Sequence, residues 1–281
     1  MKNWITFITE RIPLIVYALI VGGIVWSSLI IGGQGFQTLN FIIGFLGLYL
    51  FFCVLRLMDE VKDFDKDKIA HPDRPLPRGI LTVNDVIGSI KLTYGLMAII
   101  GLLITFLYSL YGGLCFLLVT LWLGLMYKEF FIPKWLNQHP LIYAISHQIL
   151  MIAVAAYPAF LDTSFKGSEK IFYMGLTMLG SFFTYEVCRK LNPKSDPVLG
   201  TYLVAFGPFN TFFIVLGASV VAWFGAHMLN MSYFLITAQL LVVISYLLVF
   251  IKPDKYKIVE GLASASLLIH LWCGPISLIG S

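Results

Sequence analysis

Long apolar runs dominate this sequence, and they restrict the chain to a helical fold embedded in a membrane. A run of about 20 apolar residues crosses the hydrocarbon core of a bilayer as a helix. Inside the bilayer every backbone polar group needs an internal hydrogen bond, and an α-helix provides one within a single segment. Such runs recur along the whole chain. The sequence therefore predicts an all-α, polytopic membrane protein.

The lengths and positions of these runs predict nine spans. They are expected near residues 11–32, 38–58, 83–107, 110–127, 139–161, 170–189, 200–223, 232–251 and 257–279. The turn before the span at 110–127 is so brief that a long hairpin is an alternative there. Hydrophobic residues make up 59% of the chain and charged residues only 12%, which leaves little material for a soluble domain. We expect one transmembrane domain over residues 1–281.

The distribution of Lys and Arg predicts the orientation. If the N-terminus lies inside, 17 of the 19 Lys and Arg residues fall on the inner side, and only Lys166 and Lys170 fall outside. Short loops rich in Lys and Arg stay in the cytoplasm, so we expect a cytoplasmic N-terminus and, after nine spans, a C-terminus on the opposite side. This topology explains the net charge of +4, and no basic stripe or motif indicates a nucleic-acid partner.

An acidic cluster lies at the inner end of the second predicted span, where five carboxylates occupy the nine positions 59–67. Grouped carboxylates beside lipid repel one another and are costly to desolvate, so they need compensation. If the span continues as a helix, each residue advances by about 100°. The residues on one broad stripe of that helix are Arg56, Asp59, Glu60, Asp63 and Asp67. Asp65 points away from the stripe.

This stripe is suited to hard divalent cations. Like charges three and four residues apart destabilise a helix unless they are neutralised. Oxygen ligands without Cys or His suit Mg²⁺, which usually keeps several waters and is completed by substrate phosphates. The stripe is therefore a candidate platform for Mg²⁺ and a diphosphate. The alternative is a solvated helix whose acids merely alternate with Lys62, Lys66 and Lys68.

The loop that follows, residues 71–79, is stiffened by three prolines. It carries Arg74 and Arg78, and arginine on a rigid loop is suited to bidentate contacts with phosphate. Positive-inside topology alone would also place arginines here. We favour phosphate binding for Arg74 and leave both interpretations open for Arg78.

Together these segments resemble the motifs of the UbiA superfamily of intramembrane prenyltransferases. That family has N-D-x-x-D-x-x-x-D at the cytoplasmic end of its second helix, followed by an R-P-L-P-x-G loop. The matching residues here are Asp59, Glu60, Asp63 and Asp67, then residues 74–79. Asp59 replaces the usual Asn and Glu60 the usual Asp, which keeps oxygen ligands but changes charge and reach. The resemblance covers essentially the whole chain and implies about nine helices around a central cavity.

The resemblance also implies a second acidic motif, typically D-x-x-x-D, at the cytoplasmic end of the sixth helix. Here Glu186 stands for the first acid, Lys190 takes the place of the second, and Asp196 lies six residues further on. Glu186 is then a metal ligand, while Lys190 and Arg189 are candidates to neutralise the diphosphate. The alternative is that Arg189, Lys190 and Lys194 only mark the inner side of the membrane.

A third element follows the fourth span. UbiA-like enzymes often have a Tyr and a Lys in this loop that contribute to the diphosphate pocket, which makes Tyr127 and either Lys128 or Lys134 candidates. His147 in the fifth span and Asn210 in the seventh are polar residues at membrane depth and candidates to line the cavity. A packed, hydrogen-bonded histidine is the alternative for His147.

The mechanism implied by the resemblance is ionisation of an allylic prenyl diphosphate at cytosolic motif loops near 59–82, 128–138 and 189–200. The metal ligands it implies are Asp59, Glu60, Asp63, Asp67 and Glu186. The diphosphate contacts it implies are Arg56, Arg74, Tyr127, Lys128, Lys134, Arg189 and Lys190. Asp59, Asp63 and Lys190 would be catalytic, and the acceptor that captures the prenyl group stays unidentified.

Two alternative functions stay open. A UbiA-type terpene cyclase or lyase would act on the prenyl diphosphate without an acceptor, and the altered second motif is compatible with it. A membrane transporter would use the acids for cations, but it predicts acids near the middle of the bilayer and broken helices. The acids of this chain lie at the cytoplasmic ends of the predicted spans instead.

Overall fold

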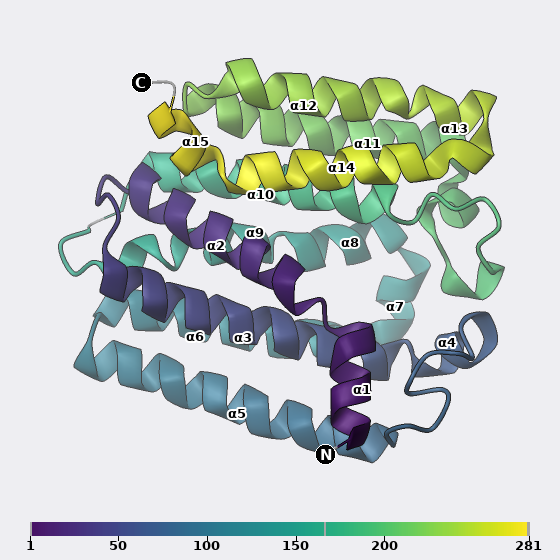
Figure 1. The fold of residues 1–281 in the computed structure, drawn as a ribbon, viewed down its shortest axis with the longest axis horizontal. Helices are drawn as coiled ribbons and strands as arrows, with labels where there is room; N and C mark the ends of the chain where they lie inside the picture. The colour runs from purple at the N-terminus through teal and green to yellow at the C-terminus, as the bar shows by residue number, and fades with distance from the viewer. Residues whose placement is uncertain (1, 166, 280–281) are drawn as a thin grey trace.

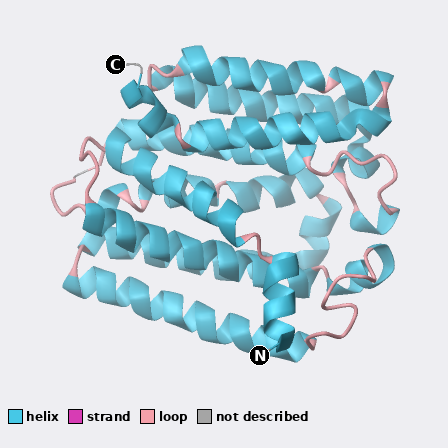
Figure 2. Ribbon diagram, in the orientation of Figure 1, coloured by secondary structure: helices cyan, strands magenta, loops and turns pink. Residues whose placement is uncertain are grey.

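The computed structural model describes residues 2–165 and 167–279, which form helices and loops without a strand (Figure 2). The α-helices, in chain order, are α1 (Lys2–Arg11), α2 (Leu14–Ile31), α3 (Thr38–Lys62), α4 (Phe64–Ala70), α5 (Val83–Leu107), α6 (Leu110–Tyr127), α7 (Pro133–Gln138), α8 (Pro140–Gln148), α9 (Leu150–Ala156), α10 (Glu169–Cys188), α11 (Tyr202–Met228), α12 (Ser232–Ser245), α13 (Leu247–Ile251), α14 (Tyr256–Leu271) and α15 (Cys273–Ile279). Short 3₁₀ helices lie at Glu129–Phe131 (η1), Ala159–Leu161 (η2), Pro197–Leu199 (η3) and Pro253–Lys255 (η4).

Seven of the predicted spans are confirmed as helical segments long and apolar enough to cross a membrane. These segments are Leu14–Ile31, Thr38–Lys62, Val83–Leu107, Leu110–Tyr127, Glu169–Cys188, Tyr202–Met228 and Tyr233–Ile251. The spans expected at 139–161 and 257–279 are built from shorter pieces, α8 with α9 and α14 with α15. The count of nine is therefore not confirmed in the part of the chain that the structure describes.

The long helices form a closed arrangement. Successive helices contact each other from α2 through α3, α5, α6, α9, α10, α11, α12 and α14, and α14 returns to α2. Helix α10 also contacts α2 directly, so it lies close to the centre of the arrangement (Figure 1). Most contacts join neighbours in the chain, as expected for a helix bundle with short connections.

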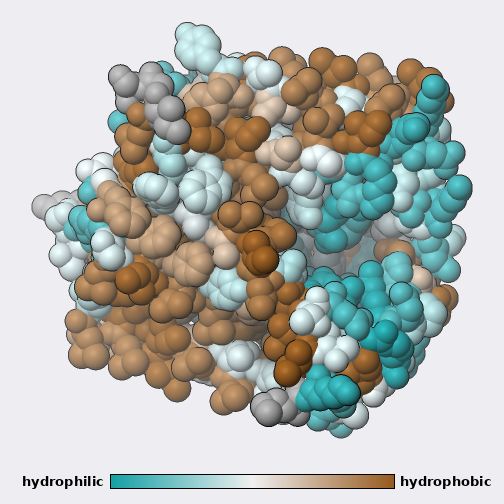
Figure 3. Space-filling view, in the orientation of Figure 1, coloured by the Kyte–Doolittle hydropathy of each residue, from teal (hydrophilic) through white to brown (hydrophobic). Residues whose placement is uncertain are grey.

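Polar residues concentrate at one end of the molecule. The loops after α3 and α10, together with α1, α4 and α7, lie at this end, whereas α15 lies at the other (Figure 1). Hydrophilic surface gathers here in two groups with a hollow between them, and the flanks of the bundle are largely hydrophobic (Figure 3). The three predicted motif loops therefore share one end. Lys166, one of the two lysines predicted to face outward, lies outside the described residues.

Small residues allow α10 and α11 to approach closely. A Cβ added at Gly180 would lie 2.4 Å from both the Ala218 carbonyl oxygen and the Ala222 amide nitrogen. Because apolar side chains gain little by leaving lipid for a helix interface, membrane helices associate largely through such close packing. Helix α10 carries Glu186 near its C-terminal end, so this packing also positions the second motif.

We expect Gly180→Ala to lower the free energy of unfolding in detergent by about 1–3 kcal/mol, because the new methyl group meets backbone atoms that cannot rotate away. Gly217→Ala is the matched control on α11, since nothing lies within 4 Å of a Cβ there. Thermal unfolding of the two variants measures the difference. Equal unfolding midpoints for the two variants would show that α10 and α11 accommodate the added methyl group without loss of stability.

Candidate active site

The first acidic motif stays helical as it leaves the bundle. The Asp63 amide donates to the Asp59 carbonyl at 2.9 Å, and the Asp67 amide donates to the Asp63 carbonyl at 2.8 Å. The chain therefore passes from α3 to α4 with its helical spacing nearly unchanged. This spacing places Asp59, Asp63 and Asp67 along one side, while the side chain of Asp65 is 91% exposed.

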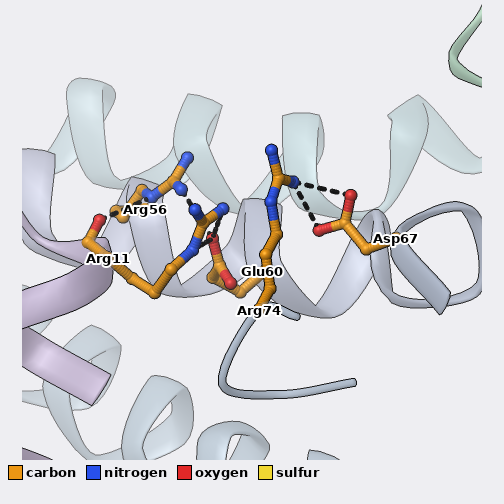
Figure 4. Close-up of polar contacts among 5 residues, drawn as sticks. All are labelled: Arg11, Arg56, Glu60, Asp67 and Arg74. Carbon is orange, nitrogen blue, oxygen red and sulfur yellow. Dashed lines mark hydrogen bonds and ion pairs between the residues drawn. The ribbon is translucent and has the colours of Figure 1, made fainter. Parts of the chain in front are cut away.

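Glu60 is held by two arginines (Figure 4). Its Oε1 lies 2.7 Å from Nη2 of Arg11 and 2.7 Å from Nη2 of Arg56, and its side chain is only 2% exposed. Nε of Arg56 also donates to the Arg11 carbonyl at 2.9 Å. In the structure Glu60 therefore acts as a buried counter-ion that joins α1 to α3, and Arg56 is engaged in the same cluster.

Asp67 is held by the proline-rich loop. Nη1 of Arg74 donates to both carboxylate oxygens of Asp67, at 2.6 and 2.7 Å, and Asp67 is buried (Figure 4). Arg78 in the same loop pairs with Glu10 of α1 at 2.9 Å, in an exposed position. The loop is thus attached to α4 through Arg74 and to α1 through Arg78.

The second motif forms its own charge cluster. Glu186 Oε2 accepts from Nε of Arg189 at 2.6 Å, and its Oε1 lies 2.5 Å from Nζ of Lys190. Nζ of Lys190 also lies 5.8 Å from the centre of the Tyr202 ring. Helix α4 contacts η3, so the loop after Glu186 lies against the first motif.

Asp59 and Asp63 differ from the other predicted ligands. No hydrogen bond or ion pair from the described residues reaches either carboxylate, although both are placed to interact electrostatically with surrounding cations. Protein atoms around Asp63 displace much of its water and Asp67 adds a like charge, so the pKa of Asp63 is raised even though its side chain still reaches solvent. These two carboxylates remain available for a ligand.

A small pocket borders Asp59, between α3, α6 and α8. It has a volume of about 10 Å³, and its polar lining consists of Asp59, Lys62, Tyr127 and His147. Two of the predicted site residues from outside the first motif, Tyr127 and His147, are therefore brought beside Asp59.

The sequence interpretation did not include Lys62 and Glu129 in the site. Nζ of Lys62 donates to the Tyr143 hydroxyl at 2.6 Å and lies 3.6 Å from Glu129. Glu129 and the two residues after it have φ of 48°, 52° and 61°, a left-handed backbone that is strained for residues with side chains. Only two features of the sequence indicated their involvement: Lys62 lies inside the acidic motif, and Glu129 lies two residues after Tyr127.

Three predicted residues lie apart from this pocket. Lys128 and Lys134 are exposed, and Nζ of Lys128 lies 5.4 Å from the centre of the Tyr127 ring. Asn210 is exposed on α11 and donates to the Phe206 carbonyl of its own helix. The structure does not bring Asn210 together with His147.

The predicted metal ligands are not gathered into a ready-made cage. Within the described ranges, no group of three or more His, Cys, Asp or Glu side chains is arranged to hold a metal ion. Glu60, Asp67 and Glu186 are occupied by cations, which leaves Asp59 and Asp63 as oxygen donors.

Comparison with known proteins identifies the family. The model of the UbiA prenyltransferase family matches residues 20–267. This chain belongs to the UbiA prenyltransferase family. A search of curated proteins found no match.

Two solved structures have the same fold as this UbiA family member. A UbiA homologue from Aeropyrum pernix K1 has a TM-score of 0.68 and 14% identity, with 93% of this chain and 98% of that chain covered. A structure of digeranylgeranylglyceryl phosphate synthase has a TM-score of 0.60 and 16% identity, with 97% of this chain and 99% of that chain covered. The UbiA-like fold expected from the motifs is confirmed.

We expect Glu60→Gln to destabilise the protein by about 3 kcal/mol, because two largely buried guanidinium groups lose their counter-charge. Glu10→Gln is the control, since its pair with Arg78 is exposed and removal should cost less than about 1 kcal/mol. Unfolding is measured in detergent without divalent ions. Unchanged stability of Glu60→Gln, combined with weaker Mg²⁺ binding, would identify Glu60 as a ligand instead.

We expect Asp63→Asn to stabilise the metal-free protein at neutral pH. The raised pKa of Asp63 means that the folded state disfavours the ionised carboxyl. Ionised Asp63 therefore lowers the free energy of unfolding at high pH, and this loss of stability disappears as the pH falls towards the ordinary pKa of an aspartate. The gain from Asp63→Asn should shrink accordingly on acidification. Unfolding midpoints of the variant and the wild type, measured across this pH range with a chelator present, test this prediction. A stability gain that grows as the pH falls would contradict it.

Proposed function

We propose that this protein is a Mg²⁺-dependent intramembrane prenyltransferase that ionises a prenyl diphosphate and transfers the prenyl group to a small or lipidic acceptor. Membership of the UbiA prenyltransferase family supports the reaction class. The observation that carries the proposal is the pair of carboxylates Asp59 and Asp63, which no hydrogen bond or ion pair from the part of the chain that the structure describes reaches. Arg189 interacts electrostatically with Asp59, and Lys190 with Asp63, so acids and bases from both motifs converge here.

The donor set fits a metal that the substrate completes. Mg²⁺ is usually bound through one or two carboxylates together with substrate phosphates, so a cage of protein ligands is not required. Asp59 and Asp63 are the residues that would hold it. Bound Mg²⁺ supplies Lewis-acid stabilisation of the departing diphosphate.

The cations of the second motif bind the diphosphate in this proposal. Lys190 and Arg189 stabilise negative charge as it develops on the leaving group, in a region where water is partly excluded. Glu186 orients both, because it pairs with each of them. Lys190 therefore contributes a fixed positive charge at the position where relatives have a second carboxylate.

The first motif supplies the rigid frame. The Arg74–Asp67 pair holds the proline-rich loop against α4, and the cluster of Arg11, Arg56 and Glu60 holds α1 against α3. These contacts restrict movement of the backbone that carries Asp59 and Asp63. Positioning of this kind is a major source of rate acceleration when a reaction needs groups from several elements.

The bundle itself shields the reaction. The prenyl chain is apolar and would lie among the helices, on the membrane side of the two carboxylates. Exclusion of water there protects a carbocation from hydrolysis. The acceptor remains unassigned, and we place the site and the N-terminus on the cytoplasmic side because of the distribution of Lys and Arg.

We expect Asp63→Asn to reduce the Mg²⁺-dependent release of diphosphate by at least about 100-fold, because one of the two metal-binding carboxylates becomes a neutral amide. Asp65→Asn is the matched control, since Asp65 belongs to the same acidic run but is 91% exposed. The assay follows diphosphate released from farnesyl and geranylgeranyl diphosphate by protein in lipid, with mass spectrometry of the products.

Similar loss in both variants would show a general effect of negative charge instead of a specific site. Full turnover by Asp63→Asn would refute the proposed chemistry. A cyclic or hydrocarbon product formed without an acceptor would identify a terpene cyclase or lyase.

A further inference from the structure

The pocket beside Asp59 has room for one small group. Its volume of about 10 Å³ is close to what one water molecule requires. The apolar residues around it are Leu55, Met58, Leu123 and Met126. A group of this size must therefore find its polar partners among the few polar side chains that face it.

One of these partners is His147. Its Nδ1 lies 2.8 Å from the Tyr143 carbonyl oxygen. A carbonyl only accepts, so Nδ1 carries the proton and Nε2 of the neutral ring is a hydrogen-bond acceptor. This Nε2 is buried and makes no hydrogen bond of good geometry to the described residues, although the Met126 carbonyl also lies near the ring. The buried acceptor is left unsatisfied by the protein itself.

The ring of His147 is held in place. It stacks on the Tyr143 ring at a centroid distance of 4.2 Å and an interplanar angle of 13°. The Phe130 ring makes an edge-type contact with the His147 ring, with a centroid distance of 5.9 Å and an interplanar angle of 76°. Phe130 is one of the three residues with left-handed backbone, so the strained turn after α6 contributes to the position of the ring.

The donor nearest to the pocket is already occupied. Nζ of Lys62 donates to the Tyr143 hydroxyl at 2.6 Å and to the Met126 carbonyl at 3.3 Å, and it lies near Glu129. For the Asp59 carboxylate, in contrast, the described residues provide no hydrogen bond or ion pair, only longer-range interactions with cations. The pocket thus offers two acceptors, His147 Nε2 and the Asp59 carboxylate, together with the Tyr127 hydroxyl, which can donate or accept. A group that fills the pocket satisfies the two acceptors only by donating. The ammonium of Lys62 beside the pocket disfavours a second cation, which favours a neutral donor, and an O–H group can at the same time accept from the Tyr127 hydroxyl.

We propose that this pocket binds a single hydroxyl group, which donates to Nε2 of His147, and that the oxygen of this hydroxyl captures the prenyl group. The inference rests on the proposed function. The bond between C1 of the prenyl group and the diphosphate oxygen breaks, and its electron pair leaves with the diphosphate. The hydroxyl oxygen bonds to C1, and its proton passes to Nε2 of His147.

The occupant of the pocket is tested without turnover. A high-resolution experimental structure of the wild-type protein without substrate should show an ordered oxygen within hydrogen-bond distance of His147 Nε2. His147→Phe keeps the flat ring but removes Nε2, and should lose this oxygen. A dry pocket in the wild type, or a protein group bonded to Nε2, would overturn the inference whether or not the protein is an enzyme.

The source of the hydroxyl is tested by labelling. The protein is supplied with farnesyl diphosphate and Mg²⁺ in H₂¹⁸O, with and without 1-O-hexadecylglycerol as a probe alcohol. Farnesol labelled with ¹⁸O identifies water as the hydroxyl source, and a farnesyl ether identifies the alcohol. A carbon-linked or hydrocarbon product would refute the assignment of oxygen as the nucleophile.

The role of His147 is tested with matched variants. His147→Phe should lower formation of the oxygen-linked product by about 100-fold, since positioned acid–base groups contribute at least that much. The KM for farnesyl diphosphate should stay unchanged. His227→Phe is the control, because His227 lies in the last turn of α11 and stacks on Trp223, away from the pocket.

An unchanged rate in His147→Phe would overturn the inference. If that variant does not fold, His147→Gln replaces it, because its amide can accept a hydrogen bond but takes up no proton and should show the same loss. If the wild-type protein releases no diphosphate at all, the proposed function fails, and the structural test alone decides whether the pocket holds a hydroxyl group.

Discussion

Compensation of negative charge at the membrane edge determines how the rest of this site is organised. Three of the predicted ligands, Glu60, Asp67 and Glu186, are neutralised by basic side chains at distances of 2.5–2.7 Å. The pairs of Glu60 and Asp67 fasten α1 and the proline-rich loop beside Asp59 and Asp63, for which the described residues provide no ion pair, whereas the pairs of Glu186 stay within the end of α10 and the residues that follow it. The same physical rule therefore separates the acids that hold the structure together from the two that can bind a ligand.

The fold was predictable where one run of sequence contains all the necessary information. The helices α5 and α6 begin and end where the apolar runs predict, and Ser109 caps α6 by accepting from the Gly112 amide. The prediction was less successful where a span is assembled from pieces. Helix α8 begins at Pro140 and is followed by α9, and neither reaches the length of a membrane span alone.

The site was predictable in its residue types but not in its pairing. Helical spacing placed Asp59, Glu60 and Asp63 near one another without information from the fold. One of the two partners of Glu60 is Arg11, which lies 49 residues earlier in the chain. The contact depends on how α1 crosses the end of α3, so no local pattern reveals it. The left-handed turn that brings Glu129 to Lys62 is equally hidden, because its residues have no glycine to signal the conformation.

Under the proposed function, the two motifs differ in what they contribute to binding the metal and the diphosphate. A carboxylate at position 190 would add a metal ligand, whereas Lys190 adds a positive charge that needs no metal. A fixed ammonium stabilises the leaving group as a point charge and hydrogen-bond donor, whereas a metal ion would supply Lewis-acid stabilisation that the ammonium lacks. The requirement for a metal therefore falls on Asp59 and Asp63. Asp59 also borders the pocket that contains His147, so departure of the leaving group and capture of the prenyl group are expected to occur close together.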